Sequence, residues 1–336
     1  MSANPDCDVA IQSCKLYKTY GGNMKRVLKI IGIIVLVLIV LIAAFLIYLS
    51  RKPAVSDDYT TKVETGGTIE SKYLAMGSHE VSYLEQAGMH DFKKYEIYYP
   101  SDLTDGTEKY PVVIYSNGTG IKASKYPAVL KHLASWGFIV MATEEENSWN
   151  GFSSEMCLRT IIQLNETETV EGLEVNPFYN HVDLDNIGVS GHSQGGVGVI
   201  NAATENKHGD MIKTIFSASP TNLALAEALQ WEYDPSLISV PVFLVSSTGN
   251  SDENLVVSGT QLQEIYNAIP DNVTKVMARR TNADHGDMLS FADGYMTAWF
   301  MWQLQGDEEA AKAFIGDSPE ILNNELYTDQ QISLSQ

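Results

Sequence analysis

Cysteine is scarce in this sequence. Three are present in 336 residues, and two of them, Cys7 and Cys14, precede a long apolar run. Cys157 is the one cysteine of the main domain, so a fold built on a disulfide framework is excluded there. We interpret Cys157 as a buried, apolar helix residue.

Positive charge is also scarce. The chain has 22 Lys and Arg against 42 Asp and Glu, and the excess of acid is carried by the part that follows residue 52. A field of this sign repels nucleic acid and anionic headgroups, and it favours neutral or cationic partners. We therefore expect no nucleic-acid partner.

Long hydrophobic runs are absent except at residues 30–49, which read IIGIIVLVLIVLIAAFLIYL and contain no charge. Twenty residues at about 1.5 Å each span roughly 30 Å, the thickness of a bilayer core. Five basic residues precede the run and two follow it, which orients the N-terminus to the cytoplasm. The pattern predicts a single-pass signal anchor in the cell membrane, with the main domain extracytoplasmic and the lipid bilayer as partner.

A cleavable signal peptide is the alternative for this segment. Residues 54–56 form a poor cleavage site, so we favour an uncleaved anchor. Met24 is itself a suitable start, so residues 1–23 are either a long tail or lie before the true start. We expect a cytoplasmic tail at 1–29, a transmembrane segment at 30–49, a linker at 50–77 and a catalytic domain at 78–336.

Short apolar runs alternate with helical stretches through the main domain. This alternation is typical of parallel β-α-β units whose sheet is covered on both faces, with functional groups at the carboxyl ends of the strands. We predict strands at 96–99, 112–116, 138–142, 187–190, 215–218, 242–246 and 275–278. We predict helices at 126–136, 153–164, 195–203, 261–268, 289–304 and 307–314.

The first candidate for chemistry is Ser193, in the G-x-S-x-G pattern of residues 191–195. A predicted strand precedes the pattern and a predicted helix rich in small residues follows it. A serine on such a sharp strand-to-helix turn presents its hydroxyl above the sheet. We predict that Ser193 is a nucleophile rather than the capping serine of a glycine-rich turn.

A serine hydroxyl needs a base to take its proton. Two histidines follow Ser193 in the chain, His208 and His285. His208 ends the helix after the nucleophile and cannot return to the turn. His285 lies in the loop after the last predicted parallel strand, so we predict it as the general base.

A carboxylate must then orient the imidazole and stabilise its charged form. The loop after strand 242–246 carries Asp252 and Glu253. We predict Asp252 as the acid, with Glu253 as the alternative. Asp284 and Asp287 flank the histidine and are expected to stabilise its loop.

An acyl-transfer site also requires backbone N–H donors for the developing oxyanion. The backbone N–H of Gln194, directly after the nucleophile, is the first candidate. The second is the N–H of Thr119, because Gly118 allows a tight turn after strand 112–116.

These motifs resemble the polyester-hydrolase, cutinase-like and chlorophyllase-like branch of the α/β-hydrolases. The matching stretches are YPVVIYSNGT at 110–119, LASWGFIV at 133–140, GHSQGG at 191–196, DHG at 284–286, and AWF with QLQGD between 298 and 307. The resemblance covers roughly residues 95–314. Asn117 departs from the histidine or proline of many relatives, and the acid loop is longer than usual.

The resemblance implies an α/β-hydrolase fold and a serine esterase that acts on a small-molecule or polymeric ester, with no metal and no organic cofactor. Residues 219–240 are too few for a large cap domain, so we expect an open pocket, with Trp149 and Trp231 as candidate lining residues. The alternative from another class is a catalytically silent surface binding protein with a hydrolase fold.

Overall fold

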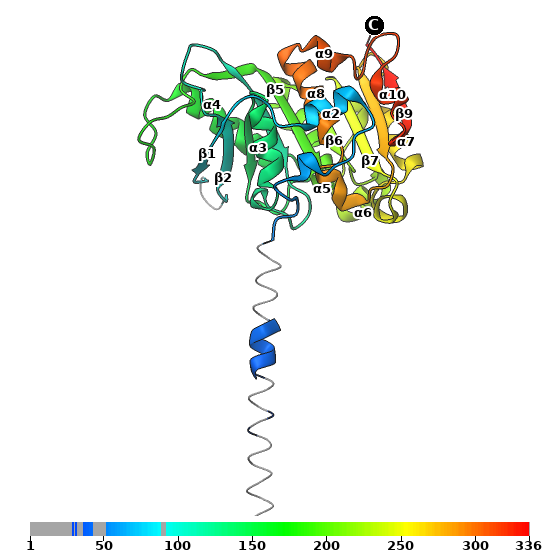
Figure 1. Cartoon of the computed structure of the whole chain (residues 1–336), viewed down its shortest axis with the longest axis horizontal. Coiled ribbons are helices and arrows are strands. Elements are labelled where there is room, and N and C mark those ends of the chain that lie inside the picture. Colours follow the sequence, from blue (N-terminus) through cyan, green and yellow to red (C-terminus); the bar gives the residue numbers. More distant parts are fainter. Residues whose placement is uncertain (1–28, 30, 32–35, 43–51, 89–91, 336) are drawn as a thin grey trace, which may run out of the picture. The chain divides into compact units, whose positions relative to one another are not determined.

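The computed structural model describes residues 29, 31, 36–42, 52–88 and 92–335, and the chain divides into two units, Met1–Lys52 and Pro53–Gln336 (Figure 1). Much of the predicted transmembrane segment at 30–49 lies outside the described residues. Among the residues that are described, no helix is both long enough and apolar enough to cross a membrane.

The second unit is built on one mixed sheet. Its described strands follow the order β1-β2-β4-β3-β5-β6-β7-β8-β9, in which the central run from β4 to β8 is parallel and β1, β2 and β9 pair antiparallel at the two edges. The strands are β1 (Val81–Gln86), β2 (Tyr95–Pro100), β3 (Tyr110–Ser116), β4 (Ile139–Thr143), β5 (Val182–His192), β6 (Ile212–Ala218), β7 (Val242–Ser247), β8 (Lys275–Arg280) and β9 (Tyr327–Ser333).

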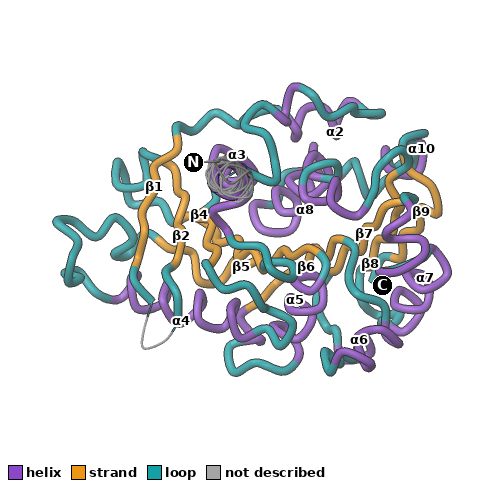
Figure 2. Tube along the Cα trace, turned by 90° about the horizontal axis from the view of Figure 1, so that it is seen from below, coloured by secondary structure: helices purple, strands orange, loops and turns teal. Residues whose placement is uncertain are grey.

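Helices cover both faces of this sheet (Figure 2). Helices α2 (Thr68–Leu74), α3 (Pro127–Ser135) and α8 (Asp293–Gln305) lie on one face, and α4 (Phe152–Glu166), α5 (Gln194–Thr204) and α7 (Gly259–Ala268) lie on the other. Shorter elements are η1 (Tyr59–Thr61), η2 (Ala123–Lys125), η3 (Gly209–Met211), α6 (Leu223–Leu229), η4 (Pro235–Leu237), η5 (Asp252–Val256), η6 (His285–Leu289), α9 (Glu308–Ala311) and α10 (Glu320–Asn323).

Successive side chains of the central strands point to opposite faces of the sheet, so each face carries its own apolar core. In β3, Val113 and Tyr115 join the core under α3 and α8, while Val112 and Ile114 join the core under α4, α5 and α7. A strand with apolar residues on both faces suits the centre of a parallel sheet. The predicted α/β architecture is therefore confirmed, and each predicted strand overlaps an observed one.

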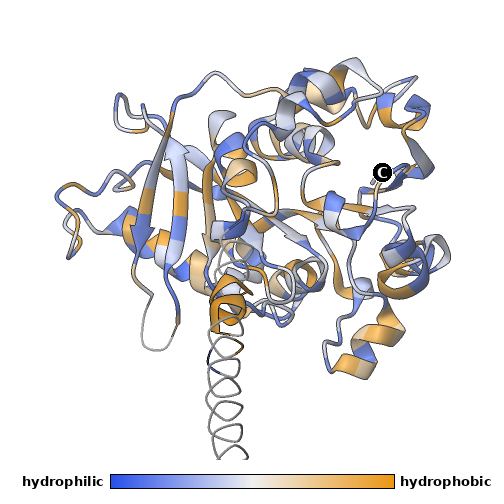
Figure 3. Ribbon diagram, turned by 60° about the horizontal axis from the view of Figure 1, so that its bottom comes forward, coloured by the Kyte–Doolittle hydropathy of each residue, from blue (hydrophilic) through white to orange (hydrophobic). Residues whose placement is uncertain are grey.

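The connection between β6 and β7 is short. It contains α6 and η4, and the ribbon of α6 is coloured largely hydrophobic in Figure 3. Leu229 at the end of this helix is 42% exposed. The edge of the sheet that carries the site thus has a small helix at this position rather than a cap domain.

Residues 53–77 differ from the predicted linker, because they fold as part of the second unit. Tyr59, Tyr73 and Leu74 are buried in the core under α3 and α8. The carboxylate of Glu320 accepts hydrogen bonds from the N–H groups of Ile69 (2.8 Å) and of the next residue (2.9 Å), which satisfies the first turn of α2. The folded unit therefore begins at Pro53 rather than at residue 78.

Cys157 lies inside α4 and is 1% exposed. Burial raises the pKa of its thiol well above the usual range, so the thiol is protonated at neutral pH. The interpretation of Cys157 as a buried apolar helix residue is confirmed.

Candidate active site

Ser193 occupies the turn between β5 and α5. Its backbone has φ 60° and ψ −120°, a conformation that costs a non-glycine residue about 1–3 kcal/mol and persists because the surroundings enforce it. Its N–H donates to Ala218 O of the neighbouring strand at 2.9 Å. A Cβ atom on Gly195 would lie 2.1 Å from Ser116 O, so the second glycine of the motif is required by the approach of β3. This is the geometry of a nucleophile turn.

His285 and Asp252 lie in contact at the ends of two neighbouring strands. His285 Nδ1 is 2.7 Å from Asp252 Oδ1, and the Asp252 side chain is fully buried. The alternative acid, Glu253, turns the other way and pairs with Arg279. Of the two carboxylates considered from the sequence, Asp252 is the one in contact with the predicted base.

The second carboxylate oxygen of Asp252 is also held. Oδ2 accepts hydrogen bonds from Ser247 N at 2.8 Å, Ser247 Oγ at 2.6 Å and Ser219 Oγ at 2.7 Å. Burial disfavours the carboxylate, but the hydrogen bonds from His285 and the two serines outweigh it, so the pKa of Asp252 is lowered. Asp252 is therefore an anion at neutral pH. Neither serine was predicted from the sequence. Their position at the carboxyl ends of β6 and β7 is the signal that could have identified them.

His192 connects the nucleophile turn with the histidine loop. Its Nε2–H donates to His285 O at 2.7 Å, and the centroids of the two rings lie 4.5 Å apart. Burial and the nearby His285 lower the pKa of His192 to about 3, so it is neutral. No hydrogen bond joins Ser193 Oγ to His285 within the described part of the chain. The contact of His192 nevertheless brings the residue before the nucleophile onto the loop of the predicted base.

The loop after β3 lies beside Ser193, the predicted nucleophile. A Cβ atom on Gly118 would be 3.5 Å from Ser193 Cβ and 3.3 Å from His192 O. The N–H groups of Thr119 and Gln194 have no hydrogen-bond acceptor among the described residues. Both predicted oxyanion donors thus belong to segments that meet at Ser193.

The two flanking aspartates organise the histidine loop, as predicted. Asp284 Oδ1 accepts from Ser251 N and His285 N, each at 2.8 Å, which ties the acid loop to the histidine loop. Asp287 Oδ2 accepts from Asp284 N at 2.8 Å, which closes a capping box at the start of η6. Neither carboxylate contacts the His285 ring.

A family model for PET hydrolase-like proteins matches residues 63–330. The chain belongs to the PET hydrolase-like family. A bis(hydroxyethyl) terephthalate hydrolase of Streptomyces coelicolor (strain ATCC BAA-471 / A3(2) / M145) is 24% identical over 193 residues, which are 56% of this chain and 54% of that protein. The chain therefore matches about half the length of this relative. The predicted resemblance to polyester hydrolases is confirmed at the level of the family.

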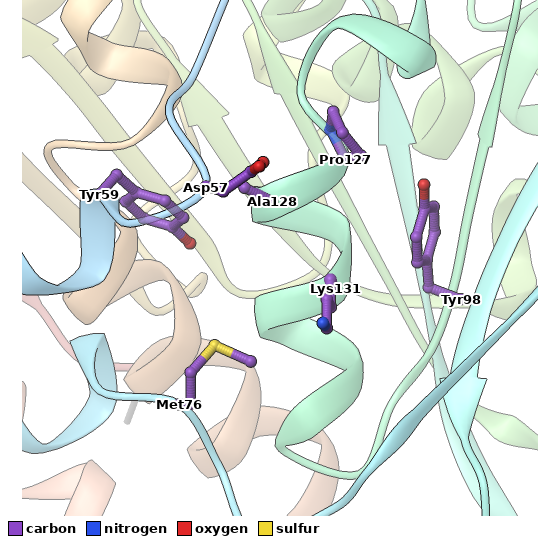
Figure 4. A pocket seen from close by; sticks show the side chains of 7 residues that line it. All are labelled: Asp57, Tyr59, Met76, Tyr98, Pro127, Ala128 and Lys131. Carbon is purple, nitrogen blue, oxygen red and sulfur yellow. The ribbon is translucent and has the colours of Figure 1, made fainter. Parts of the chain in front are cut away.

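Among the cavities formed by described residues, two are relevant to the predicted pocket, and neither is lined by Ser193. The first, of about 410 Å³, is bounded by β2, by α3 and by the segment that contains Asp57, Tyr59 and Met76 (Figure 4). Trp149 lines the second, of about 440 Å³, together with Asn201, and not with Ser193. Trp231 packs partly buried against the core under α5 and α7. The expectation that Trp149 and Trp231 line the substrate pocket stays a prediction.

No group of three or more His, Cys, Asp or Glu side chains is arranged to hold a metal ion in the described ranges. The polar contacts of the site join side chains to one another and to the backbone.

Proposed function

We propose that this chain is a serine hydrolase that cleaves carboxylic esters through an acyl-enzyme on Ser193. The observation that carries the proposal is the 2.7 Å contact of His285 Nδ1 with the buried Asp252 carboxylate, beside a nucleophile turn with φ 60° at Ser193. Membership in the PET hydrolase-like family and the relative named as a bis(hydroxyethyl) terephthalate hydrolase support ester hydrolysis.

In the first half of the reaction, Ser193 Oγ attacks the acyl carbon while its proton passes to His285 Nε2. Asp252 accepts the Nδ1–H of His285 and stabilises the imidazolium that forms. The N–H groups of Thr119 and Gln194 donate to the oxyanion of the tetrahedral intermediate. As the intermediate collapses, the C–O bond to the alcohol breaks and the alcohol leaves with the proton from His285.

Water completes the cycle. It attacks the acyl carbon and gives one proton to His285, which returns that proton to Ser193 Oγ as the acyl-enzyme bond breaks. The acyl group leaves as a carboxylic acid.

The substrate class follows from the charge of the second unit and from the relative. The sequence from residue 53 onward is strongly acidic, which disfavours anionic esters. Bis(hydroxyethyl) terephthalate, the compound in the relative's name, is a neutral diester. We propose that neutral esters, small or polymeric, are the substrates.

We further propose that the charge-free run at 30–49 anchors the chain in the cell membrane, with the second unit outside. The supporting observations are the length of the run and the excess of basic residues before it.

Labelling with a fluorophosphonate probe tests the proposed mechanism. The probe phosphonylates a serine that is activated by a base, so the wild-type chain should be labelled and the Ser193→Ala chain should not. Turnover of p-nitrophenyl acetate should fall on the order of 10³-fold or more in Ser193→Ala and in His285→Ala, because the members of a triad act as a unit. A folded wild-type chain that is neither labelled nor active would instead be a silent binding protein.

A further inference from the structure

Asn117 is the buried residue at which β3 passes into the loop that carries Thr119. It is 1% exposed. We propose that Asn117 is a positioning residue that holds the Thr119 N–H in place for the oxyanion, an inference that rests on the proposed esterase function.

The Asn117 amide is fully used. Its Nδ2 donates to Thr143 O at 2.7 Å and to Glu145 O at 2.6 Å, and its Oδ1 accepts from the hydroxyl of Tyr126. Thr143 and Glu145 belong to the end of β4 and the loop after it, and Tyr126 precedes α3. One side chain therefore ties the end of β3 to two separate parts of the fold.

The backbone at this position is fixed as well. Ser148 Oγ–H donates to Asn117 O, and a Cβ atom on Gly195 would lie 2.7 Å from the same oxygen. In the next turn, Gly120 N donates to Glu146 O at 3.0 Å. Hydrogen bonds thus hold the loop from 117 to 120 on both sides of Thr119, and the backbone oxygen of Asn117 lies against Gly195 in α5.

These hydrogen bonds have a consequence for catalysis. An oxyanion donor works because its position is set before the reaction, and loss of one donor costs about 10²–10³-fold in kcat. Without the Asn117 amide, the carbonyls of Thr143 and Glu145 lose their donor and the turn loses its anchor. The Thr119 N–H then moves relative to Ser193 although neither residue has changed.

Asn176 provides a matched control. It is also a buried asparagine, at 8% exposed, and its Nδ2 donates to Leu164 O and Thr167 O, each at 2.6 Å. Its Oδ1 accepts from Phe178 N at 3.1 Å. It joins the end of α4 to the segment before β5, whereas Ser193 follows the other end of β5.

The experiment compares Asn117→Ala with Asn176→Ala in the full chain. It measures Tm, kcat and KM with p-nitrophenyl acetate, and the affinity of a boronic acid, whose tetrahedral adduct with Ser193 carries an oxygen in the oxyanion position. Both variants should lower Tm. In Asn117→Ala, kcat should fall roughly 10- to 100-fold with KM nearly unchanged, and boronic acid affinity should fall in proportion to kcat/KM. Asn176→Ala should keep kcat and boronic acid affinity.

Equal kcat and equal boronic acid affinity in the two variants would overturn the inference, since a structural role alone lowers Tm without changing either. If Asn117→Ala does not fold, Tyr126→Phe decides, because it removes one of the three side-chain hydrogen bonds. It should lower kcat and boronic acid affinity together by a smaller factor, and unchanged values would reject the role. A wild-type chain without turnover or fluorophosphonate labelling would reject the proposed function itself.

Discussion

The carboxylate of Glu253 pairs with the guanidinium of Arg279, one residue along the chain from the carboxylate that contacts His285. The two neighbours thus point to different partners at the start of η5. Asp252 is fully buried, whereas the Glu253 side chain is 47% exposed. Asp252 and Glu253 carry the same charge at adjacent positions. Substituting each of them therefore compares the loss of the hydrogen bond to His285 with the loss of a surface charge.

The first prediction uses this pair. Asp252→Asn should lower kcat on the order of 10⁴-fold, because the asparagine amide favours the wrong tautomer of His285. Glu253→Gln should change kcat little, because the Glu253 side chain is 47% exposed and contacts Arg279 rather than His285. Steady-state kinetics on both variants checks this. A large loss in Glu253→Gln with a mild one in Asp252→Asn would transfer the role to Glu253.

The second prediction concerns the glycine behind the nucleophile. Gly195→Ala places a Cβ atom 2.1 Å from the backbone oxygen of Ser116, so β3 or α5 has to shift. We expect loss of most activity and a lower Tm, since overpacking a tight core commonly costs 1–3 kcal/mol. Gly106→Ala is the control, because its Cβ has no heavy atom nearer than 3.9 Å. Full activity in Gly195→Ala would contradict the close packing of the turn.

The third prediction is a pH dependence of stability at His132. Its ring is buried, with Nδ1 2.8 Å from Asp293 Oδ2 and Nε2 2.9 Å from Ala75 O, and Tyr59 donates to the same carboxylate. Burial lowers the pKa of His132, but Asp293 outweighs it and raises the pKa above its ordinary 6.5. A raised pKa stabilises the fold below the unfolded value, and that contribution is lost as pH rises through the folded pKa.

Urea unfolding at pH 6 and pH 9 checks this. The wild type should lose unfolding free energy between the two values, and His132→Gln should lose less, because it has no proton to release at this site. The variant should also be less stable than the wild type at pH 6, since it leaves the Asp293 carboxylate buried without its cation. An equal pH dependence in both proteins would show that His132 is not charged in the fold.

The fourth prediction concerns residues 30–49. The full chain should sediment with membranes, and protease added to intact cells should reach the part beyond Pro53. Cell fractionation and protease accessibility measure both. A released, soluble product that begins near residue 57 would show that the segment is cleaved.

Much of the site could be predicted because its signals are local. The glycines around Ser193 lie between a strand and a helix, and His285 is the histidine that chain order permits. The hydrogen bonds of His192 and Asn117 could not be predicted, since their partners lie far away in the sequence. His192 donates to a residue 93 positions away, and Asn117 to residues 26 and 28 positions away. No short pattern encodes such pairs.

The edges of the fold escaped the sequence analysis for a different reason. Strands β1 and β9 read VSYLEQ and YTDQQIS, in which polar residues interrupt the apolar ones. Edge strands tolerate such composition because one side of each has no strand to pair with. Helix α2 escaped because Glu320 satisfies its first turn, and the seven residues TIESKYL carry little signal alone.

The hydrogen bonds between Glu320 and α2 also bear on the order in which parts of the chain can fold. Glu70 N bonds to a carboxylate 250 residues further along the chain. A ribosome adds about 5–20 residues per second, so roughly 10–50 s separate the synthesis of the two partners. During that interval part of the core around Tyr73 and Leu74 is already present, because α3 is made early, but α8 and the Glu320 carboxylate are not. The contacts of α2 are therefore completed only after residue 320 has been synthesised.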